Sequence, residues 1–435
     1  MKYKGSIEVQ MLMAKKGQKQ FLISQMIASV YNNIVTGVLM TGLLLYIGVK
    51  PSDTGIFLSI PLLANVLQIG IGGIWRRNRD YKRTINRIIL ISRLGITSIV
   101  FIPLIFGRNG GQVTTAITAI TGIILGIAYI LASSAGIRLN YWMVGTIEPE
   151  TQGTFFALRD KVVVGITTLI SMGAAGLIDL LTKVHMEYLG FAVAFFLAGV
   201  CAVCDYIVLN KIEPPSVFPG EQKKERVDYL RLLTQDRRFL FFVVYMFLLN
   251  FSLNLANPYF NSYMLEELKL EYVQILLLTA MQILIQIGVA SRWGMLANKI
   301  RWMRILFGTS FTLGLQFFVW AFVTRQTLPV IVIIFMTSGL ISTGLVTGQF
   351  MVPFEFVNKK NKVLSLSLST CIASCGGFIG SVAGSQVIKS LENIKLTVGI
   401  VKLEAMQINM MISGAAILGT TLYAKLLLMN KDMNE

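Results

Sequence analysis

Charged residues are scarce in this chain of 435 residues. They make up 14% of the sequence, whereas an ordinary soluble domain has roughly 25%, and 54% of the residues are hydrophobic. Apolar runs of about 20 residues, the length that a helix needs to cross the hydrocarbon of a bilayer, recur from residue 20 almost to the end. This composition excludes a soluble globular fold, and lipid is the solvent expected for most of the chain.

The sequence also lacks the residue clusters of membrane enzymes and ATP-driven pumps. It has one histidine, His185, and no glycine-rich GxxxxGK[ST] motif of an ATPase. The four cysteines, Cys201, Cys204, Cys371 and Cys375, lie inside apolar runs, where cysteine behaves as a small hydrophobic residue. We therefore expect no enzymatic activity, no cofactor and no metal site. Energy for active movement would come from a gradient of protons or sodium ions.

The apolar runs predict an all-α polytopic membrane protein. Backbone amides in hydrocarbon need partners within their own segment, and the runs lack the alternating pattern of a transmembrane barrel. Twelve transmembrane helices are predicted, at residues 20–48, 52–75, 84–107, 112–138, 155–181, 187–209, 238–264, 270–293, 303–324, 327–352, 362–389 and 404–429.

The net charge of +17 comes from basic residues in the short segments between apolar runs. In a soluble protein this charge would suggest nucleic acid, but here membrane topology explains it. Lysine and arginine gather in alternate connecting segments, which places both termini on the cytoplasmic side of the cell membrane. The expected partners are the lipid bilayer and a small-molecule substrate, with no nucleic acid.

A polar linker divides the chain into two halves. Residues 210–237 form the longest polar stretch and contain three prolines and a glycine. They separate residues 1–209 from residues 238–435, and each half holds six predicted helices. The sequence thus predicts two six-helix bundles joined by a cytoplasmic linker.

The two halves show weak internal repetition. A shift of 218 residues places Asn32 on Asn250 and Trp75 on Trp293, and it aligns a Gln-Ile-Gly sequence in each half. Identity elsewhere at this shift is low. The matches favour a parallel duplication, an arrangement common in transporters.

The segment at residues 294–304, between the eighth and ninth predicted helices, resembles the loop signature of the major facilitator superfamily. Residues 72–80 look like a degenerate copy, and residues 148–159 are similar to the loop before helix five in many bacterial members. Asn298 stands where the family usually has an acidic residue, and Arg301 lies in the basic part of the signature. The resemblance implies a gating or structural role for these two residues.

This resemblance implies a monomeric secondary transporter with two pseudo-symmetric bundles that work by alternating access. The Gly-Pro pair that marks proton antiporters in helix five is missing, which weighs against proton-coupled drug export. Glycines in helices five and eleven are expected to permit close helix approach. They are Gly165, Gly173, Gly176, Gly376, Gly377, Gly380 and Gly384.

Polar side chains in the middle of membrane helices are costly unless they face a cavity or a partner, so they are the candidate substrate residues. Asn250, Asn254, Asn257 and Asn261 of helix seven fall on one helical face, and the Asn257-Pro258 step predicts a bend. The remaining candidates for the cavity, on helices one, two, four and eight, are Asn32, Thr36, Asn65, Gln68, Tyr129, Gln282 and Gln286. The alternative is that these amides bond neighbouring helices and only hold the bundle together.

Arg93 in helix three and Asp205 in helix six are the conspicuous charges inside membrane segments, and we expect them to pair in a structural or gating role. The middles of helices one, seven and eight carry no charge, which favours a neutral or amphipathic substrate. Export of a lipid-like or drug-like compound is the leading interpretation. Uptake of a small polar solute, or a sensor that does not transport, are the alternatives.

Overall fold

The computed structural model describes residues 16–71, 81–106, 114–147, 152–213, 237–356, 362–392, 396–398 and 401–429. Within these residues the regular elements are helices, apart from an antiparallel hairpin of β1 (Leu396–Val398) and β2 (Val401–Leu403). The chain forms two compact units. The first holds residues 1–49 and 67–225, and the second holds residues 50–66 and 226–435.

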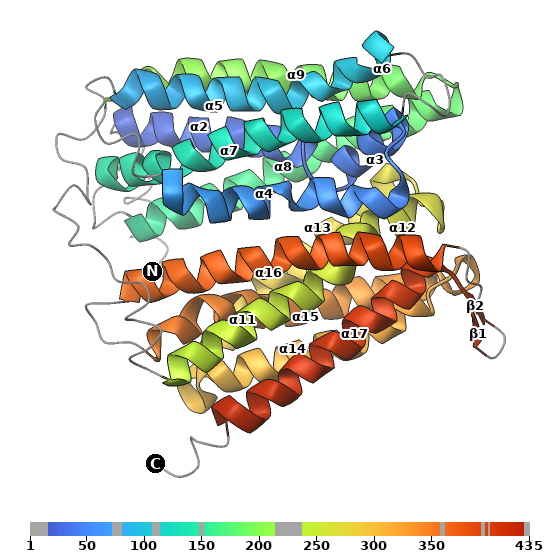
Figure 1. Cartoon of the computed structure of the whole chain (residues 1–435). Coiled ribbons are helices and arrows are strands. Elements are labelled where there is room, and N and C mark those ends of the chain that lie inside the picture. The colour runs from blue at the N-terminus through green and yellow to red at the C-terminus, as the bar shows by residue number, and fades with distance from the viewer. Residues whose placement is uncertain are drawn as a thin grey trace. The chain divides into compact units, whose positions relative to one another are not determined.

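The first unit is a bundle of long helices around an apolar core. Figure 1 shows α5 running beside α9, and α2 packs against both α8 and α9. Near one end of the bundle, Phe21 meets Trp142 edge to face, with ring centroids 5.7 Å apart. The helices are α2 (Lys16–Ile34), α3 (Gly37–Ile47), α5 (Tyr81–Ser98), η2 (Ile99–Phe101), α6 (Ile102–Phe106), α7 (Thr114–Thr146), α8 (Gln152–Lys183) and α9 (Glu187–Leu209).

The second unit begins with most of α4 (Pro51–Ile71), a helix that precedes most of the first unit in sequence. Within this unit α11 packs against α16 and α17, α14 packs against α15 and α17, and α13 packs against α15. Its other helices are α11 (Arg237–Ala256), η3 (Asn257–Tyr259), α12 (Phe260–Glu266), α13 (Tyr272–Ile300), α14 (Trp302–Ala321), η4 (Arg325–Thr327), α15 (Pro329–Met351), η5 (Val352–Phe354), α16 (Lys362–Leu391), α17 (Ala405–Ala424) and η7 (Lys425–Met429).

Glycine lets α16 lie directly on the backbone of α11. A Cβ atom on Gly376, Gly380 or Gly384 would lie only 2.4, 2.2 or 2.1 Å from a carbonyl oxygen of α11. The expected close approach is therefore confirmed for helix eleven of the sequence. The same expectation was wrong for Gly165 and Gly173 of α8, because a Cβ at either position would meet open space and no described helix packs closely there.

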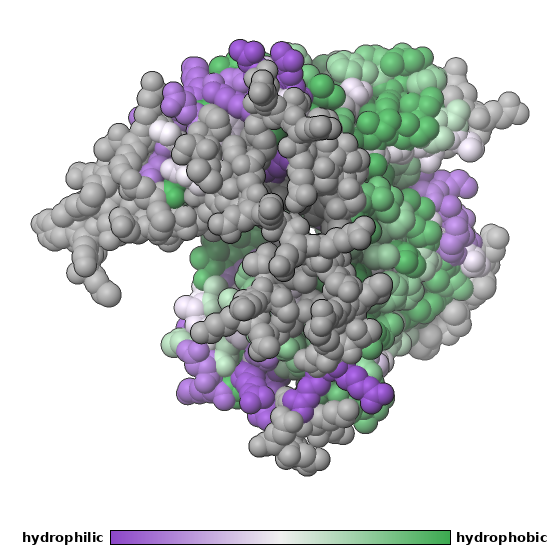
Figure 2. All heavy atoms as spheres, turned by 60° about the vertical axis from the view of Figure 1, so that its left-hand side comes forward, coloured by the Kyte–Doolittle hydropathy of each residue, from purple (hydrophilic) through white to green (hydrophobic). Residues whose placement is uncertain are grey.

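The surface of the described residues suits a membrane. Among these residues, nine helices are long and apolar enough to cross a bilayer, and ten when the bent pair α2 and α3 counts as one crossing. Large hydrophobic side chains such as Leu169 and Phe196, each 72% exposed, point outward. Figure 2 shows hydrophobic residues gathered in a broad area with hydrophilic residues toward its edges. The all-α polytopic fold predicted from the sequence is confirmed.

Helix one of the sequence is broken, although one continuous helix at residues 20–48 was predicted. α2 ends at Ile34, α3 begins at Gly37, and the two are bent by 41°. Gly37 has a φ of 60°, a left-handed conformation that glycine adopts without strain, and Thr36 before it is extended. The sequence has no proline at this break, and the apolar run continues across it. Neither feature therefore predicted the break.

The loop signature after helix eight is also more helical than predicted. α13 continues to Ile300, and the chain turns at Arg301, which has a φ of 60°. The backbone N–H of Trp302 then donates to the carboxylate of Glu355 at 3.1 Å. Residues 72–80 and most of the predicted linker at 210–237 lie outside the described residues.

Candidate functional site

The break in helix one carries a cluster of exposed polar side chains. Asn32, Asn33 and Thr36 are exposed, whereas Tyr31 and Ile34 are buried. The Thr36 hydroxyl donates to the carbonyl of Asn32 at 2.7 Å, and the Asn33 amide donates to the carbonyl of Ser29 at 3.2 Å. These bonds to the preceding turn use few of the hydrogen-bonding groups of the cluster, so the other amide donors and acceptors can bond to water or a solute.

Helix seven is interrupted at a nearly equivalent position. α11 ends at Ala256, and one turn of 3-10 helix over Asn257–Tyr259 joins it to α12. The 3-10 turn contains the Asn257-Pro258 step, at which the sequence predicted a bend. Under the shift of 218 residues, Asn257 corresponds to residue 39, three residues beyond Thr36. Both halves of the duplicated sequence therefore contain an interrupted helix at a similar place.

The asparagine row of helix seven divides into two kinds of environment. Asn250 and Asn254 are half-buried, and each amide donates to the carbonyl four residues earlier at 2.9 Å. Asn254 also lies against α16, since a Cβ on Gly377 would come within 2.9 Å of its Nδ2 atom. Asn257 is exposed at the interruption, and Asn261 is half-buried. Asn257 is therefore the exposed member of the row.

The remaining predicted residues are spread over several helices. Gln286 of α13 donates to the hydroxyl of Ser342 on α15 at 2.8 Å, so this amide bonds a neighbouring helix. Asn65, Tyr129 and Gln282 are half-buried on their helices, while the side chain of Gln68 lies outside the described part of the chain. Asn298 and Arg301 are exposed at the end of α13.

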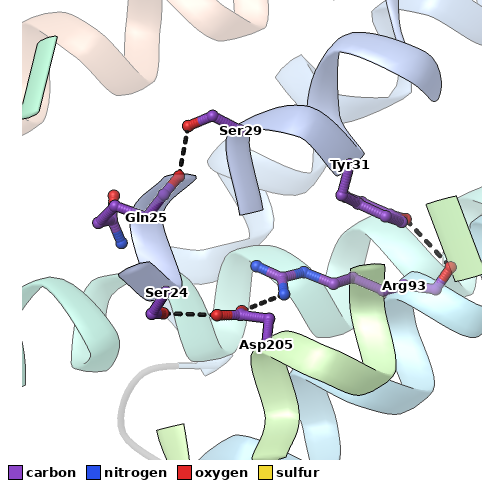
Figure 3. Close-up of polar contacts among 6 residues, drawn as sticks. All are labelled: Ser24, Gln25, Ser29, Tyr31, Arg93 and Asp205. Carbon is purple, nitrogen blue, oxygen red and sulfur yellow. Dashed lines mark hydrogen bonds and ion pairs between the residues drawn. The ribbon is translucent and has the colours of Figure 1, made fainter. Parts of the chain in front are cut away.

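Arg93 and Asp205 form an ion pair, as the sequence predicted. The guanidinium of Arg93 on α5 contacts the Asp205 carboxylate on α9, and their side chains are 11% and 1% exposed. The Ser24 hydroxyl of α2 donates to the other carboxylate oxygen at 2.5 Å. Tyr31 lies with its ring 5.3 Å from Cζ of Arg93, and its hydroxyl donates to the Arg93 carbonyl at 3.0 Å. Residues of α2, α5 and α9 therefore meet at this pair, as Figure 3 shows.

A second ion pair joins the start of α4 to the end of α16. The Lys389 ammonium lies 2.6 Å from Oδ1 of Asp53, and the Ser385 hydroxyl donates to the same oxygen at 3.1 Å. The side chains of Lys389 and Asp53 are 38% and 17% exposed. We call Asp53, Lys389 and Ser385 the clasp. It connects residues more than 330 positions apart in the chain.

Close packing reinforces the clasp at the two residues of α4 that follow Asp53. The hydroxyls of Thr54 and Ser262 lie 2.6 Å apart in a buried hydrogen bond. Gly55 faces the ring of Tyr259, where a Cβ would lie 2.2 Å from Cζ. The Tyr259 hydroxyl donates to the carbonyl of Ser381 on α16 at 2.6 Å. α4, α12 and α16 are therefore held by contacts that leave no room for a larger residue at position 55.

Sequence reasoning missed several of these residues. Ser24 and Tyr31 lie in an apolar run as ordinary helix residues, and only their spacing of seven hinted at a shared face. Asp53 and Lys389 stand at the ends of predicted helices and were not among the candidate residues. Their positions at matching ends of two predicted helices were a usable signal, because alternate helix ends lie on the same side of a membrane.

A family profile matches most of the chain. The profile of the Major Facilitator Superfamily covers residues 21–381, which include both interrupted helices and the buried ion pair of Arg93 and Asp205. The chain belongs to the Major Facilitator Superfamily, and it is a transporter of that fold. No curated protein sequence matches it.

Solved transporter structures share the fold at low sequence identity. The chain is similar to the nucleoside transporter NupG, with a TM-score of 0.66, 12% identity, and coverage of 94% of this chain and 98% of that one. It is similar to a bacterial homologue of the iron transporter ferroportin in an inward-facing state, with a TM-score of 0.69, 15% identity, and coverage of 93% and 97%. A bacterial homologue of the human lysosomal transporter Spinster, inward-facing and occupied, gives a TM-score of 0.65, 13% identity, and coverage of 95% and 97%.

Proposed function

We propose that the protein is a secondary carrier that moves a small neutral or amphipathic solute across the cell membrane by alternating access. The observation that carries this proposal is the pair of interrupted helices with exposed amides, at Asn32 to Thr36 and at Asn257. The distribution of basic residues favours cytoplasmic termini, and the proposed carrier works as a monomer.

An exposed amide inside a membrane segment needs a polar environment. Water is absent from the hydrocarbon core, so Asn32, Asn33 and Asn257 would be costly if they faced acyl chains. Transport sites commonly use interrupted helices, because the break frees backbone groups to meet the substrate. The polar clusters at the two breaks are therefore assigned to the solute pathway.

The chemistry of these clusters suits an uncharged solute with hydrogen-bonding groups. Amides and hydroxyls both donate and accept, and they offer no net charge to neutralise an ion. The buried charges of Arg93 and Asp205 neutralise each other in an ion pair. Among the similar structures is a nucleoside transporter, and a neutral, hydroxyl-bearing nucleoside agrees with this chemistry better than the iron of a ferroportin homologue.

Export of a lipid-like or drug-like compound is the leading direction, and uptake of a small polar solute is the alternative. Both use the same pathway and differ in which gradient supplies the energy. A proton or sodium gradient is the candidate source.

Two measurements on purified protein test the carrier. A panel of neutral and amphipathic solutes is screened for a rise in unfolding temperature, because a ligand that binds the native state stabilises it by mass action. A solute that stabilises the protein is then tested for flux into and out of liposomes that contain it, with imposed proton and sodium gradients. Flux of a stabilising solute supports the proposal.

Matched threonine variants connect the site to the activity. Thr36 and Thr312 are both exposed and both donate to the carbonyl four residues earlier, but Thr312 lies on α14, away from either break. Thr36→Ala and Asn257→Ala are expected to lower stabilisation and flux, and Thr312→Ala is expected to leave both unchanged. If natively folded protein shows neither stabilisation nor flux across the panel, the carrier is contradicted in favour of a sensor.

A further inference from the structure

The Arg93–Asp205 pair contacts one face of α2, and the exposed polar side chains occupy another. Ser24 and Tyr31 are seven residues apart, close to two full turns, so they share a face. Both are buried and both bond to the residues of the pair. Asn33 lies about 200° around the helix from Tyr31, at about 100° per residue, and is exposed.

We propose that Ser24, Tyr31, Arg93 and Asp205 form a positioning network that sets the rotation of α2 about its own axis. The network thereby holds Asn32, Asn33 and Thr36 toward the solute pathway. That Asn32, Asn33 and Thr36 face a solute pathway rests on the proposed function. That the network sets the rotation of α2 rests only on the contacts of Ser24 and Tyr31 with Arg93 and Asp205.

Directional bonds are needed because apolar packing alone fixes rotation weakly in a membrane. Acyl chains and leucine side chains are equally apolar, so a helix gains little by burying one apolar face over another. The Ser24 hydroxyl bonds to Asp205 at 2.5 Å, and the Tyr31 hydroxyl bonds to the Arg93 carbonyl at 3.0 Å. These two anchors are about 10 Å apart along the helix, at about 1.5 Å per residue. Together they define both the rotation and the axial position of α2.

The second anchor acts directly before the interruption. Tyr31 lies in the last turn of α2, which ends at Ile34, and Thr36 follows in extended conformation. In Figure 3 the Gln25 side chain points away from the ion pair, while Ser24 points into it. Ser24 and Gln25 are adjacent in sequence, but only the Ser24 side chain points toward the ion pair.

Thiol labelling measures the rotation without any substrate. The parent protein carries serine or alanine in place of Cys201, Cys204, Cys371 and Cys375. Two reporters, Asn33→Cys and Ala28→Cys, are introduced separately, since Asn33 is exposed and Ala28 is 7% exposed. The probe is the charged reagent methanethiosulfonate ethyltrimethylammonium. Because modification requires solvent access, Asn33→Cys is expected to react at least about tenfold faster than Ala28→Cys.

The network variants should reduce this ratio. In the double variant Ser24→Ala with Tyr31→Phe, both anchors from α2 are lost while the ion pair stays, and the ratio is expected to fall below about threefold. Ser29→Ala is the matched control, because the Ser29 hydroxyl donates only to the Gln25 carbonyl of its own helix, at 2.6 Å. Asn86→Ala, which removes an amide bond to Asn210, controls for general loss of stability. Both controls should keep the ratio of the parent.

An unchanged ratio in the folded double variant overturns the positioning network. Asp205→Asn should lower the ratio further if this variant folds. If it does not fold, the double variant Ser24→Ala with Tyr31→Phe still decides the test. The test is independent of the proposed function. Suppose the parent shows the expected labelling ratio, the double variant loses it, and no solute flux is found. This result supports the network and contradicts the carrier.

Discussion

Two ion pairs that join separate helices have the same chemistry and very different surroundings. Arg93 and Asp205 lie within membrane segments, at 11% and 1% exposure, with Ser24 and Tyr31 around them. Asp53 and Lys389 lie near helix ends and are more exposed, at 17% and 38%. A buried charge depends on its partner for all its compensation, whereas an exposed one has water as a substitute. The first pair should therefore be essential to the fold, and the second should add little through charge.

The largest predicted effect comes from breaking the buried pair on one side. Asp205→Asn leaves the Arg93 guanidinium without a counter-charge, which should destabilise the protein by about 3–5 kcal/mol. The loss is measured as a lower unfolding temperature and a smaller yield of monodisperse protein in detergent.

Replacing both charges of the buried pair provides the control. Arg93→Met combined with Asp205→Leu removes both desolvated charges, and it should recover most of the stability that either single change loses. Single variants as stable as the parent would show that water reaches Asp205, contrary to its burial.

The next effect tests whether packing outweighs charge at the clasp. Gly55→Ala places a methyl group where the Tyr259 ring lies, at a distance that requires a shift of the ring or of α4. Overpacking of this kind should cost about 1–3 kcal/mol. Gly288→Ala on α13 is the matched control, because a Cβ there meets open space. A Gly55→Ala protein that unfolds at the parent's temperature would contradict the close approach of α4 and Tyr259.

A smaller effect is expected from the charges of the clasp. Asp53→Asn keeps the shape of the side chain and removes the attraction to Lys389, so it should cost no more than about 1 kcal/mol. The difference from the parent should shrink as salt is raised from about 0.01 M to about 1 M, because salt screens exposed charges. Thermal unfolding at several salt concentrations measures it. A loss as large as that of Asp205→Asn would mean that the clasp is desolvated.

The sequence predicted what depends on composition and on charge balance. Apolar length located α9 at its observed bounds, Glu187–Leu209, and the predicted pairing of Arg93 with Asp205 is confirmed. Both predictions follow from the cost of polar groups in lipid, which is independent of tertiary detail.

The rest depends on contacts that no local pattern encodes. The break before Gly37 needs a left-handed glycine conformation, but other glycines in the membrane segments are helical. The clasp joins residues 332 and more positions apart, and its docking depends on the absence of a side chain at Gly55. The asparagine row was read as one surface, although Asn250 and Asn254 bond to their own helix.

A third pair of charged groups extends the comparison, because both partners are acids. Glu267 follows α12 and Glu404 precedes α17, outside the membrane segments. Burial raises the pKa of Glu267 from 4.5 to about 7, and the hydrogen bond and charge of Glu404 add to the rise, while Lys269 opposes it. The folded protein therefore holds a proton that the unfolded chain releases between these pH values.

This difference in bound protons sets the direction of the pH effect. The stabilising contribution of protonated Glu267 is complete below about pH 4.5 and is lost as the pH rises through about 7. Above that pH both carboxylates are negatively charged and repel each other. Glu267→Gln should keep the hydrogen bond and remove the titration, so it should unfold about 2 °C higher than the parent at about pH 8 and equally at about pH 5. Glu266→Gln, beside Lys269 at 3.2 Å, is the control and should keep the pH slope of the parent. Equal slopes for Glu267→Gln and the parent would show that these acids do not share a proton.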